Sequence, residues 1–212
     1  MEMNPKVKDA LEWIGCIIIA VILALIIRYF VGTPTVVENS SMFPTLKDGQ
    51  RLIINRLART FGDTYERGQI VTLEAPSDTK VVSFNKNTDE PIAKYYEPGS
   101  VFERFTYYFL EIGKTSYIKR VIGLPGEHVQ ISDGKVYING EVLDEPYLQN
   151  NVTTPEAGVF YDLVVPEGTL FLMGDNRERS MDSRSFGCVP FSKIESKVWI
   201  RFWPFNLFGS VD

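Results

Sequence analysis

One apolar run near the N-terminus limits the folds open to this chain more than any other feature. The run extends from Leu11 to Val31, and only Glu12 and Arg28 interrupt it. These 21 positions (31 − 11 + 1) would form a helix about 31 Å long, which matches a bilayer core of roughly 30 Å. A cleaved signal peptide or a buried core helix are the alternatives. The run is long for a signal peptide and lacks a small-residue cleavage site, so we favour an uncleaved anchor.

The charges beside this run indicate its orientation. Lys6 and Lys8 precede it, whereas only Arg28 closes it. This bias places the N-terminus in the cytoplasm. We therefore expect a single-pass protein of the cell membrane, with residues 1–33 as its cytoplasmic N-terminus and anchor. Residues 34–212 would form an extracytoplasmic domain, and the lipid bilayer would be a partner of the chain.

The composition argues against several classes of function. The 22 Lys and Arg residues are scattered and are outnumbered by 27 Asp and Glu, so we expect no nucleic-acid partner. The single histidine, His128, cannot supply a metal cluster, and Cys16 and Cys188 cannot form a disulfide framework. We therefore expect no metal and no other cofactor.

Beyond Pro34 the sequence changes to short β-prone runs that glycine and proline separate. Asp133-Gly134 and Asn139-Gly140 predict two tight hairpins. The pattern predicts a mainly β domain with antiparallel strands. The expected strands are Arg51–Asn55, Gln69–Leu73, Tyr117–Ile122, His128–Ile131, Lys135–Ile138, Thr169–Met173 and Lys197–Phe202.

Residues 85–116 interrupt this pattern with a polar piece followed by an aromatic one. Apolar positions in the aromatic piece recur at near-helical spacing and predict a short amphipathic helix. The helix could cap the β core, which is the commoner role, or face the membrane, because aromatic side chains favour the interface. These apolar positions are Phe102, Phe105, Phe109 and Ile112.

A serine beside a proline-fixed bend, Ser41 in Ser-Met-Phe-Pro-Thr-Leu, is a candidate nucleophile just beyond the anchor. A serine needs a base, and the only histidine, His128, follows a turn where we expect exposure. Lysine can serve only when neutral, and a free lysine is neutral at pH 7 in about one molecule in 2500. Burial can lower a lysine pKa by roughly 3 to 5 units. The base should therefore lie in an apolar strand, as Lys119 does.

Two Ser-x-x-Lys sequences, Ser77–Lys80 and Ser116–Lys119, offer an alternative of the penicillin-binding type, whose serine and lysine lie one helical turn apart. The first lies in a polar loop and the second opens a strand, so we disfavour both. A further polar segment, residues 174–184, directly follows an apolar run, where a loop can deliver side chains into a site. Its serines could orient a neutral lysine, and an Asp-Arg pair could brace the turn.

Three segments that occur in order after the anchor resemble the type I signal peptidases, the membrane-anchored Ser/Lys proteases that remove signal peptides from exported proteins. They are Ser-Met-x-Pro-Thr-Leu at 41–46, Tyr-Ile-Lys-Arg-Val-Ile-Gly-Leu-Pro-Gly-Glu at 117–127 and Gly-Asp-Asn-Arg-x-x-Ser-x-Asp-Ser-Arg at 174–184. The resemblance covers the anchor and essentially all of the domain. It implies a β-rich catalytic domain with a small β extension at about residues 126–166.

The same resemblance implies an activity and a substrate. The chain would be a membrane-bound serine endopeptidase of protein secretion that cleaves the signal peptides of preproteins after small residues. Cleavage would pass through an acyl-enzyme intermediate on a Ser/Lys dyad. The substrate would bind in an extended form by strand addition. We expect the enzyme to act as a monomer.

Carried over by position, the resemblance makes Ser41 the nucleophile and Lys119 the general base. Ser180 would hydrogen-bond to Lys119 and orient it. The oxyanion hole would combine the backbone N–H of Ser41 with a group at Asn39, where the family commonly has serine or glycine. The supporting residues would be the pair Asp182 and Arg184, Asp175 in the same turn, and Met42, which would line the site.

The spacing of 78 residues (119 − 41) between Ser41 and Lys119 is long, and residues 85–116 are the insertion that accounts for it. Two rival interpretations remain. A Ser/Lys self-cleaving repressor would need a DNA-binding region where this chain has its apolar run. A membrane-tethered β domain that only binds exported chains would share the anchor and the fold, and loss of activity on changing the dyad would distinguish it from a peptidase.

Overall fold

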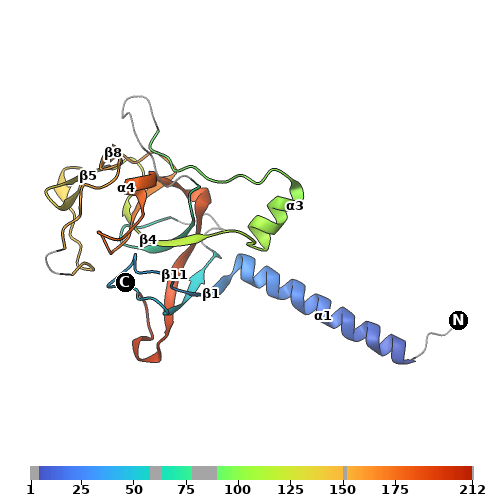
Figure 1. The fold of residues 1–212 in the computed structure, drawn as a ribbon. Coiled ribbons are helices and arrows are strands. Elements are labelled where there is room, and N and C mark those ends of the chain that lie inside the picture. Colours follow the sequence, from blue (N-terminus) through green and yellow to red (C-terminus); the bar gives the residue numbers. More distant parts are fainter. Residues whose placement is uncertain (1–4, 58–63, 78–89, 150–151, 212) are drawn as a thin grey trace.

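A long helix projects from a β-rich domain in the computed structural model, which describes residues 5–57, 64–77, 90–149 and 152–211 (Figure 1). The helix, α1, spans Pro5–Phe30. Its segment Lys6–Phe30 is long and apolar enough to cross a membrane, and none of its most apolar stretch is buried against the domain. An isolated apolar helix exposed along its length is the form that the predicted anchor requires.

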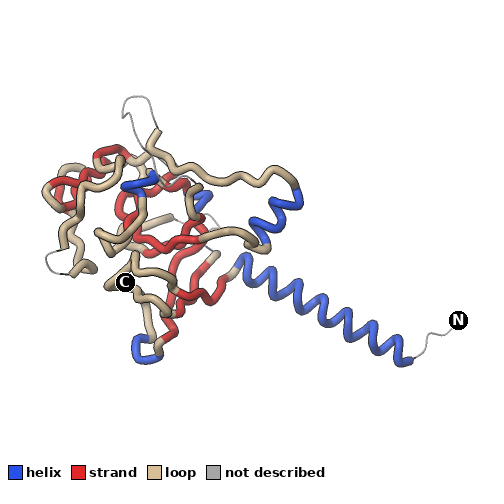
Figure 2. Tube along the Cα trace, in the orientation of Figure 1, coloured by secondary structure: helices blue, strands red, loops and turns tan. Residues whose placement is uncertain are grey.

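The strands of the domain, red in Figure 2, form two antiparallel sheets. The larger has the strand order β1-β2-β11-β3-β4-β9-β10, and the smaller has the order β7-β6-β5-β8. The larger sheet contains β1 (Gly32–Val36), β2 (Arg51–Asn55), β3 (Ile70–Glu74), β4 (Ser116–Gly123), β9 (Thr169–Met173), β10 (Val189–Pro190) and β11 (Ile194–Trp203). The smaller contains β5 (His128–Ser132), β6 (Lys135–Ile138), β7 (Glu141–Val142) and β8 (Asp162–Val164).

All seven predicted strands are present, and their bounds differ from the prediction by at most three residues. Both predicted hairpins are confirmed as well. Asp133 and Gly134 connect β5 to β6 with φ angles of 51° and 74°, and Asn139 and Gly140 connect β6 to β7 with 52° and 87°. Positive φ at both central residues is the geometry that these turn sequences favour. The mainly β, antiparallel fold class is therefore confirmed.

Strand β4 is buried on both faces. Because successive side chains point to opposite sides of a strand, Val121 packs into one apolar cluster with β3, while Ile122 packs into another between the two sheets. Lys119 and Arg120 precede them, and only 3% and 2% of their surfaces are exposed. The interior position of this strand therefore forces two charged side chains into the protein.

The insertion forms a short helix but does not cap the core. Helix α3 (Val101–Arg104) begins with a capping box between Ser100 and Glu103 and continues into a π-helical turn, η1 (Phe105–Phe109). Neither element contains a buried residue. The predicted helix is confirmed, whereas its expected role as a cap over the core is wrong. Residues 85–89 of the insertion lie outside the described residues.

Helix α3 does not cap the core because it points away from the sheets. Figure 1 shows α3 beside the end of α1 rather than over the sheets.

Three short elements complete the fold: α4 (Ser183–Phe186), η2 (Phe191–Lys193) and η3 (Phe205–Leu207). Of these, α4 follows the polar loop that begins at the end of β9 and helps to shape the site.

Replacing Phe171 should test how strongly the core between the sheets stabilises the domain. Phe171 is fully buried in the cluster that joins the two sheets. We expect Phe171→Ala to lower the free energy of unfolding by roughly 3–5 kcal/mol, through lost apolar burial and a cavity. Urea unfolding of the detergent-solubilised chain measures this. Phe205→Ala, at a side chain that is 73% exposed, is the control, and equal effects of the two changes would contradict the assignment.

Candidate active site

Ser41 and Lys119, which are 78 residues apart in the sequence, meet in the structure. The Lys119 Nζ donates a hydrogen bond of 3.0 Å to the Ser41 Oγ. The Ser116–Lys119 alternative does not have the helical geometry that it needs. Ser116–Lys119 lies within strand β4, where residues three apart point to opposite faces, and Lys80 of the other pair lies outside the described residues.

The backbone around Ser41 is held by one residue of the polar loop, Asn176. The Asn176 backbone N–H donates to the Ser41 carbonyl at 3.0 Å, and its side-chain Nδ2 donates to the Ser40 carbonyl at 3.0 Å. These bonds fix the segment between β1 and β2 against the loop. Asn176 was not predicted as a site residue, although it belongs to the Gly-Asp-Asn-Arg motif.

Strand pairing places Lys119 at the point where the neighbouring strand β9 ends. On one side Lys119 is in register with Val71 of β3. On the other side β9 pairs with β4 only from Arg120 onward, opposite Met173. The loop that starts at Gly174 therefore begins beside Lys119. This geometry explains why the loop and the lysine, which are distant in sequence, form one site.

Burial makes the Lys119 amine easy to deprotonate. Desolvation lowers its pKa from 10.5 to about 8, with a smaller contribution from Arg184, while the charges of Asp182 and Asp175 oppose the shift. At pH 7 roughly one molecule in ten then carries a neutral amine, rather than about one in 2500. The Nζ also lies 5.4 Å from the centroid of the Tyr117 ring. The amine can thus accept a proton from a neighbouring hydroxyl near neutral pH.

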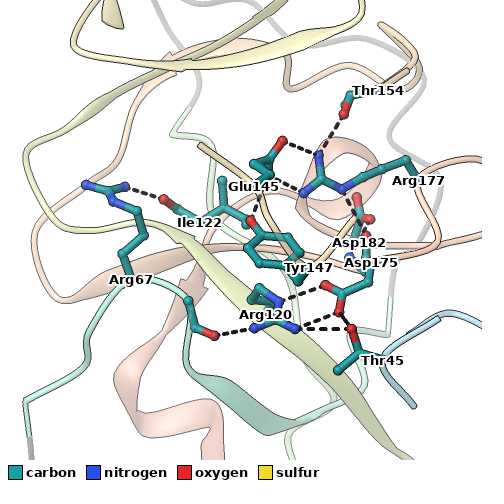
Figure 3. Close-up of polar contacts among 12 residues, drawn as sticks. Thr45, Arg67, Arg120, Ile122, Glu145, Tyr147, Thr154, Asp175, Arg177 and Asp182 are labelled. Atoms are coloured by element: carbon teal, nitrogen blue, oxygen red, sulfur yellow. Dashed lines mark hydrogen bonds and ion pairs between the residues drawn. The ribbon is translucent and has the colours of Figure 1, made fainter. Parts of the chain in front are cut away.

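Asp175 forms a buried ion pair with Arg120 (Figure 3). The two Arg120–Asp175 hydrogen bonds measure 2.8 and 2.7 Å, and Asp175 also accepts from the Thr45 hydroxyl at 2.6 Å. Asp175 was expected to stabilise the same turn as Asp182. Instead it joins β4 to the bend that follows Ser41. The cause is the burial of both faces of β4, which leaves Arg120 in need of a carboxylate partner.

Asp182 and Arg184 form the expected pair, with bonds of 2.8 and 2.9 Å between the guanidinium and the carboxylate. Asp182 also caps α4 and accepts from the Gly174 N–H at 3.0 Å. Both side chains are buried. The pair therefore holds the polar loop against Gly174, its first residue.

A second buried arginine, Arg177, connects the loop to the segment between strands β7 and β8 of the smaller sheet. It forms an ion pair with Glu145 and donates to the Thr154 hydroxyl at 2.6 Å and to the Gly174 carbonyl at 3.1 Å (Figure 3). Sequence reasoning gave Arg177 no role. Its position in the motif was the only signal, because a charged residue in a polar loop normally suggests a solvated side chain.

Ser180 does not form the predicted hydrogen bond to Lys119. Within the described part of the chain its buried Oγ has no hydrogen-bond partner. The hydroxyl instead lies against Gly174, where a Cβ would stand 2.2 Å from the Ser180 Oγ and 2.4 Å from the Ser41 carbonyl oxygen. Ser180 thus lies beside the Ser41 backbone, and its side chain points at Gly174, which separates them.

Met42 and Asn39 flank Ser41 differently. Met42 is buried in an apolar cluster beneath the site and also lines the cleft. Asn39 adopts a φ angle of 80°, its side chain is exposed, and its backbone N–H donates to the Asp48 carboxylate at 3.0 Å. Among the described residues, the side-chain amide of Asn39 has no hydrogen bond.

Ser41 and Lys119 both line a cleft. Its lining includes β1, an edge strand of the larger sheet, and the part of β4 that β9 leaves unpaired. Unpaired strand edges can bond to an added strand. Arg28 at the end of α1 and Glu111 of the insertion also line the cleft. Among the described residues, no group of three or more His, Cys, Asp or Glu could hold a metal ion.

Known proteins similar to this chain were found by sequence and by structure. The family model described as signal peptidase, peptidase S26, matches residues 10–203. Signal peptidase I of Bacillus licheniformis is 38% identical over 219 residues, covering 100% of this chain and 98% of that protein. Signal peptidase IB of Staphylococcus aureus strain N315 is 35% identical over 215 residues, covering 95% and 93%. A crystal structure of a signal peptidase I from Enterococcus faecalis V583 is 27% identical, covers 64% of this chain and 97% of that chain, and has a TM-score of 0.39.

Removing the Lys119 charge should stabilise the protein near neutral pH. The folded pKa of about 8 lies below the usual 10.5, so the unfolded chain binds more protons between these values and stability rises with pH across that window. Below pH 8 the penalty is fully present and amounts to at most about 3 kcal/mol. We expect Lys119→Met to raise the free energy of unfolding at pH 7 by up to that amount.

Urea unfolding at pH 7 and pH 10 measures this difference. Lys135→Met, at an exposed lysine of β6, is the control and should leave stability nearly unchanged at both pH values. A Lys119→Met variant that is less stable than the parent at pH 7 would contradict the burial penalty.

Proposed function

This chain belongs to the signal peptidase family of S26 peptidases, serine endopeptidases that cleave signal peptides, and we propose that Ser41 and Lys119 form its catalytic dyad. The observation that carries the proposal is the 3.0 Å contact between the Lys119 Nζ and the Ser41 Oγ. The lowered Lys119 pKa supports the same roles. A domain that only binds exported chains would have no use for a buried lysine held against a serine.

In the proposed mechanism neutral Lys119 accepts the proton of the Ser41 hydroxyl as the Oγ attacks the scissile carbonyl carbon. The resulting tetrahedral intermediate collapses when the lysine ammonium returns the proton to the leaving amine. The signal peptide is then held as an ester on Ser41, and the mature chain departs. Lys119 next deprotonates a water molecule that hydrolyses the ester, which restores both residues.

The developing oxyanion would be stabilised at the segment that precedes Met42. We propose the Ser41 backbone N–H as one donor and a group of Asn39 as the second. The positive φ of Asn39 supports a tight bend directly before the nucleophile, and its exposed side chain borders the cleft. One donor of this kind typically contributes a factor of about 10²–10³ in rate.

The remaining predicted residues would position the dyad rather than react. Asp182 with Arg184, and Asp175 with Arg120, would hold the loop and the bend around Ser41. Ser180 would orient Lys119 only after its side chain rotates, and its buried hydroxyl, which has no partner among the described residues, supports such a rotation. Met42 would form the apolar floor of the cleft.

We propose that the substrate is the extended end of a signal peptide, added as a strand between β1 and the free edge of β4. Small residues at the first and third positions before the cut would fit, because shallow pockets reject larger side chains. Residues 1–33 would be the cytoplasmic N-terminus and single-pass anchor, and residues 34–212 the extracytoplasmic catalytic domain, with 85–116 as an insertion and about 126–166 as an extension. The enzyme would act as a monomer at the bilayer surface.

Exchanging the two adjacent serines should identify the nucleophile. We expect Ser41→Ala to lower kcat for a purified preprotein at least 10³-fold, because loss of a serine nucleophile leaves only binding and oxyanion stabilisation. Ser40→Ala, which removes an exposed hydroxyl one residue away, is the matched control and should retain activity. Gel analysis of preprotein cleavage measures both rates. Undiminished cleavage by the Ser41→Ala variant would rule out the dyad.

The pH dependence should report the base. We expect kcat/KM for a short signal-peptide substrate to rise with pH through an ionisation near 8, since only neutral Lys119 can accept the serine proton. His128→Asn is the control, because His128 lies on the surface in a 2.6 Å pair with Asp162. Its profile should match that of the parent. Loss of the ascending limb in this variant would transfer the role to the histidine.

A further inference from the structure

The insertion carries an exposed apolar face that neither the fold nor the dyad explains. Val101 is 84% exposed, Phe102 is 75% exposed, Phe105 is 51% exposed and Ile112 is 62% exposed. These four side chains belong to residues 95–112, which we call the aromatic arm. Clustered exposed apolar side chains of this size mark an interaction surface more often than chance exposure.

Buried ion pairs hold the base of the arm on the core. Lys114, just beyond the arm, forms ion pairs with Glu195 and, at 3.8 Å, with Glu74. Glu74 also accepts from the Tyr107 hydroxyl at 3.3 Å and pairs with Lys193 at 3.0 Å. Buried charges are stable only when they are paired in this way. The exposed apolar face is therefore presented by an anchored element.

The arm is also joined to the end of α1. The rings of Tyr29 and Phe109 lie 5.1 Å apart between centroids, and Phe109 stacks on Phe105 at 5.3 Å. Arg28 forms an ion pair of 2.8 Å with Glu111. Figure 1 shows α3 beside this end of the long helix. The apolar face of the arm thus lies at the level where the proposed membrane span leaves the bilayer.

We propose that the aromatic arm is a second membrane contact, which inserts Val101, Phe102 and Phe105 into the lipid interface beside α1. The proposal rests on the proposed anchoring of the chain by α1. Phenylalanine and valine gain free energy when they enter the acyl boundary of a bilayer. A lone spanning helix leaves the domain free to tilt and rotate, whereas a second contact fixes the cleft above the membrane.

The nearby charges indicate that this contact is apolar rather than electrostatic. The Glu103 carboxylate accepts from the backbone N–H groups of Gly99 and Ser100, so it is engaged in capping α3. Arg104 donates to the Pro98 carbonyl at 3.2 Å. Glu103 and Arg104 are adjacent and carry opposite charges, so together they present no net charge to a headgroup. The arm should therefore bind neutral and anionic lipid alike and should be insensitive to salt.

A depth measurement on the full chain tests the contact directly. An environment-sensitive NBD fluorophore is attached to a Phe102→Cys variant in which Cys16→Ser removes the exposed native thiol, while Cys188 is buried. The protein is reconstituted into vesicles of phosphatidylethanolamine and phosphatidylglycerol. We expect blue-shifted emission, quenching by lipids spin-labelled near the headgroup, and protection from aqueous iodide.

The matched control carries the fluorophore at Val142→Cys, an exposed apolar position on β7 of the smaller sheet. There we expect water-like emission and full quenching by iodide. Equal iodide quenching at positions 102 and 142 would overturn the membrane contact. This readout needs no cleavage, so it remains informative if the proposed dyad is wrong.

A kinetic comparison tests the positioning role. We expect the double change Phe102→Ser and Phe105→Ser to slow cleavage of a vesicle-inserted preprotein roughly tenfold, because two phenylalanine contacts with the lipid interface are lost. Cleavage of a short soluble peptide in detergent should stay unchanged. Val142→Ser with Val164→Ser is the control at exposed valines of the smaller sheet.

Two outcomes would overturn the positioning role. An equal loss on both substrates would mean that the arm contacts the peptide chain itself or supports the dyad. An unchanged rate on the inserted preprotein would mean that the arm does not set the position of the cleft. A parent protein that cleaves neither substrate would refute the proposed function instead.

Discussion

The burial of one amine governs the arrangement around it. A substantial fraction of the Lys119 amine is neutral near pH 7 because desolvation lowers its pKa to about 8, and two nearby carboxylates, Asp182 and Asp175, act against this. Each carboxylate has an arginine of its own, Arg184 for Asp182 and Arg120 for Asp175. Because an arginine offsets the charge of each carboxylate, the carboxylates stabilise the loop without raising the Lys119 pKa back to its usual value. The ion pairs thus help to keep the Lys119 pKa low and also stabilise the fold.

The polar loop depends on a close approach that only glycine permits. Gly174 follows β9 at the level of Lys119, and a Cβ there would stand 2.4 Å from the Ser41 carbonyl oxygen. Its N–H donates to Asp182 and its carbonyl accepts from Arg177, so the loop is tied on both sides of this residue. The segment that contains Ser41 therefore packs directly on the backbone of the loop. Motif residues that do not react, such as Gly174 and Asn176, have their physical explanation in this contact.

Sequence reasoning located the strands, the hairpins and the residues of the candidate dyad, because each leaves a local pattern. It did not foresee the partner of Asp175, because alternation along β4 cannot show that packing between two apolar clusters buries both faces of the strand. It expected a bond from Ser180 to Lys119, but side-chain rotation decides that contact and leaves no trace in the sequence. The insertion shows the same limit. Helical spacing identified its apolar face, while only the fold determines whether that face meets the core.

One shared carboxylate connects the proposed anchor to the domain that carries the candidate dyad. Glu111 pairs with Arg28 at the end of α1 at 2.8 Å and with Arg56, just after β2, at 2.7 Å. It therefore links the proposed anchor, the insertion and the larger sheet at the point where the cleft opens beside α1. Strand β1 continues from α1 after only one residue, Val31, and lines the same cleft. A substrate strand added along β1 would consequently run from the membrane surface to Ser41 over a path that covalent connection and this ion pair both define.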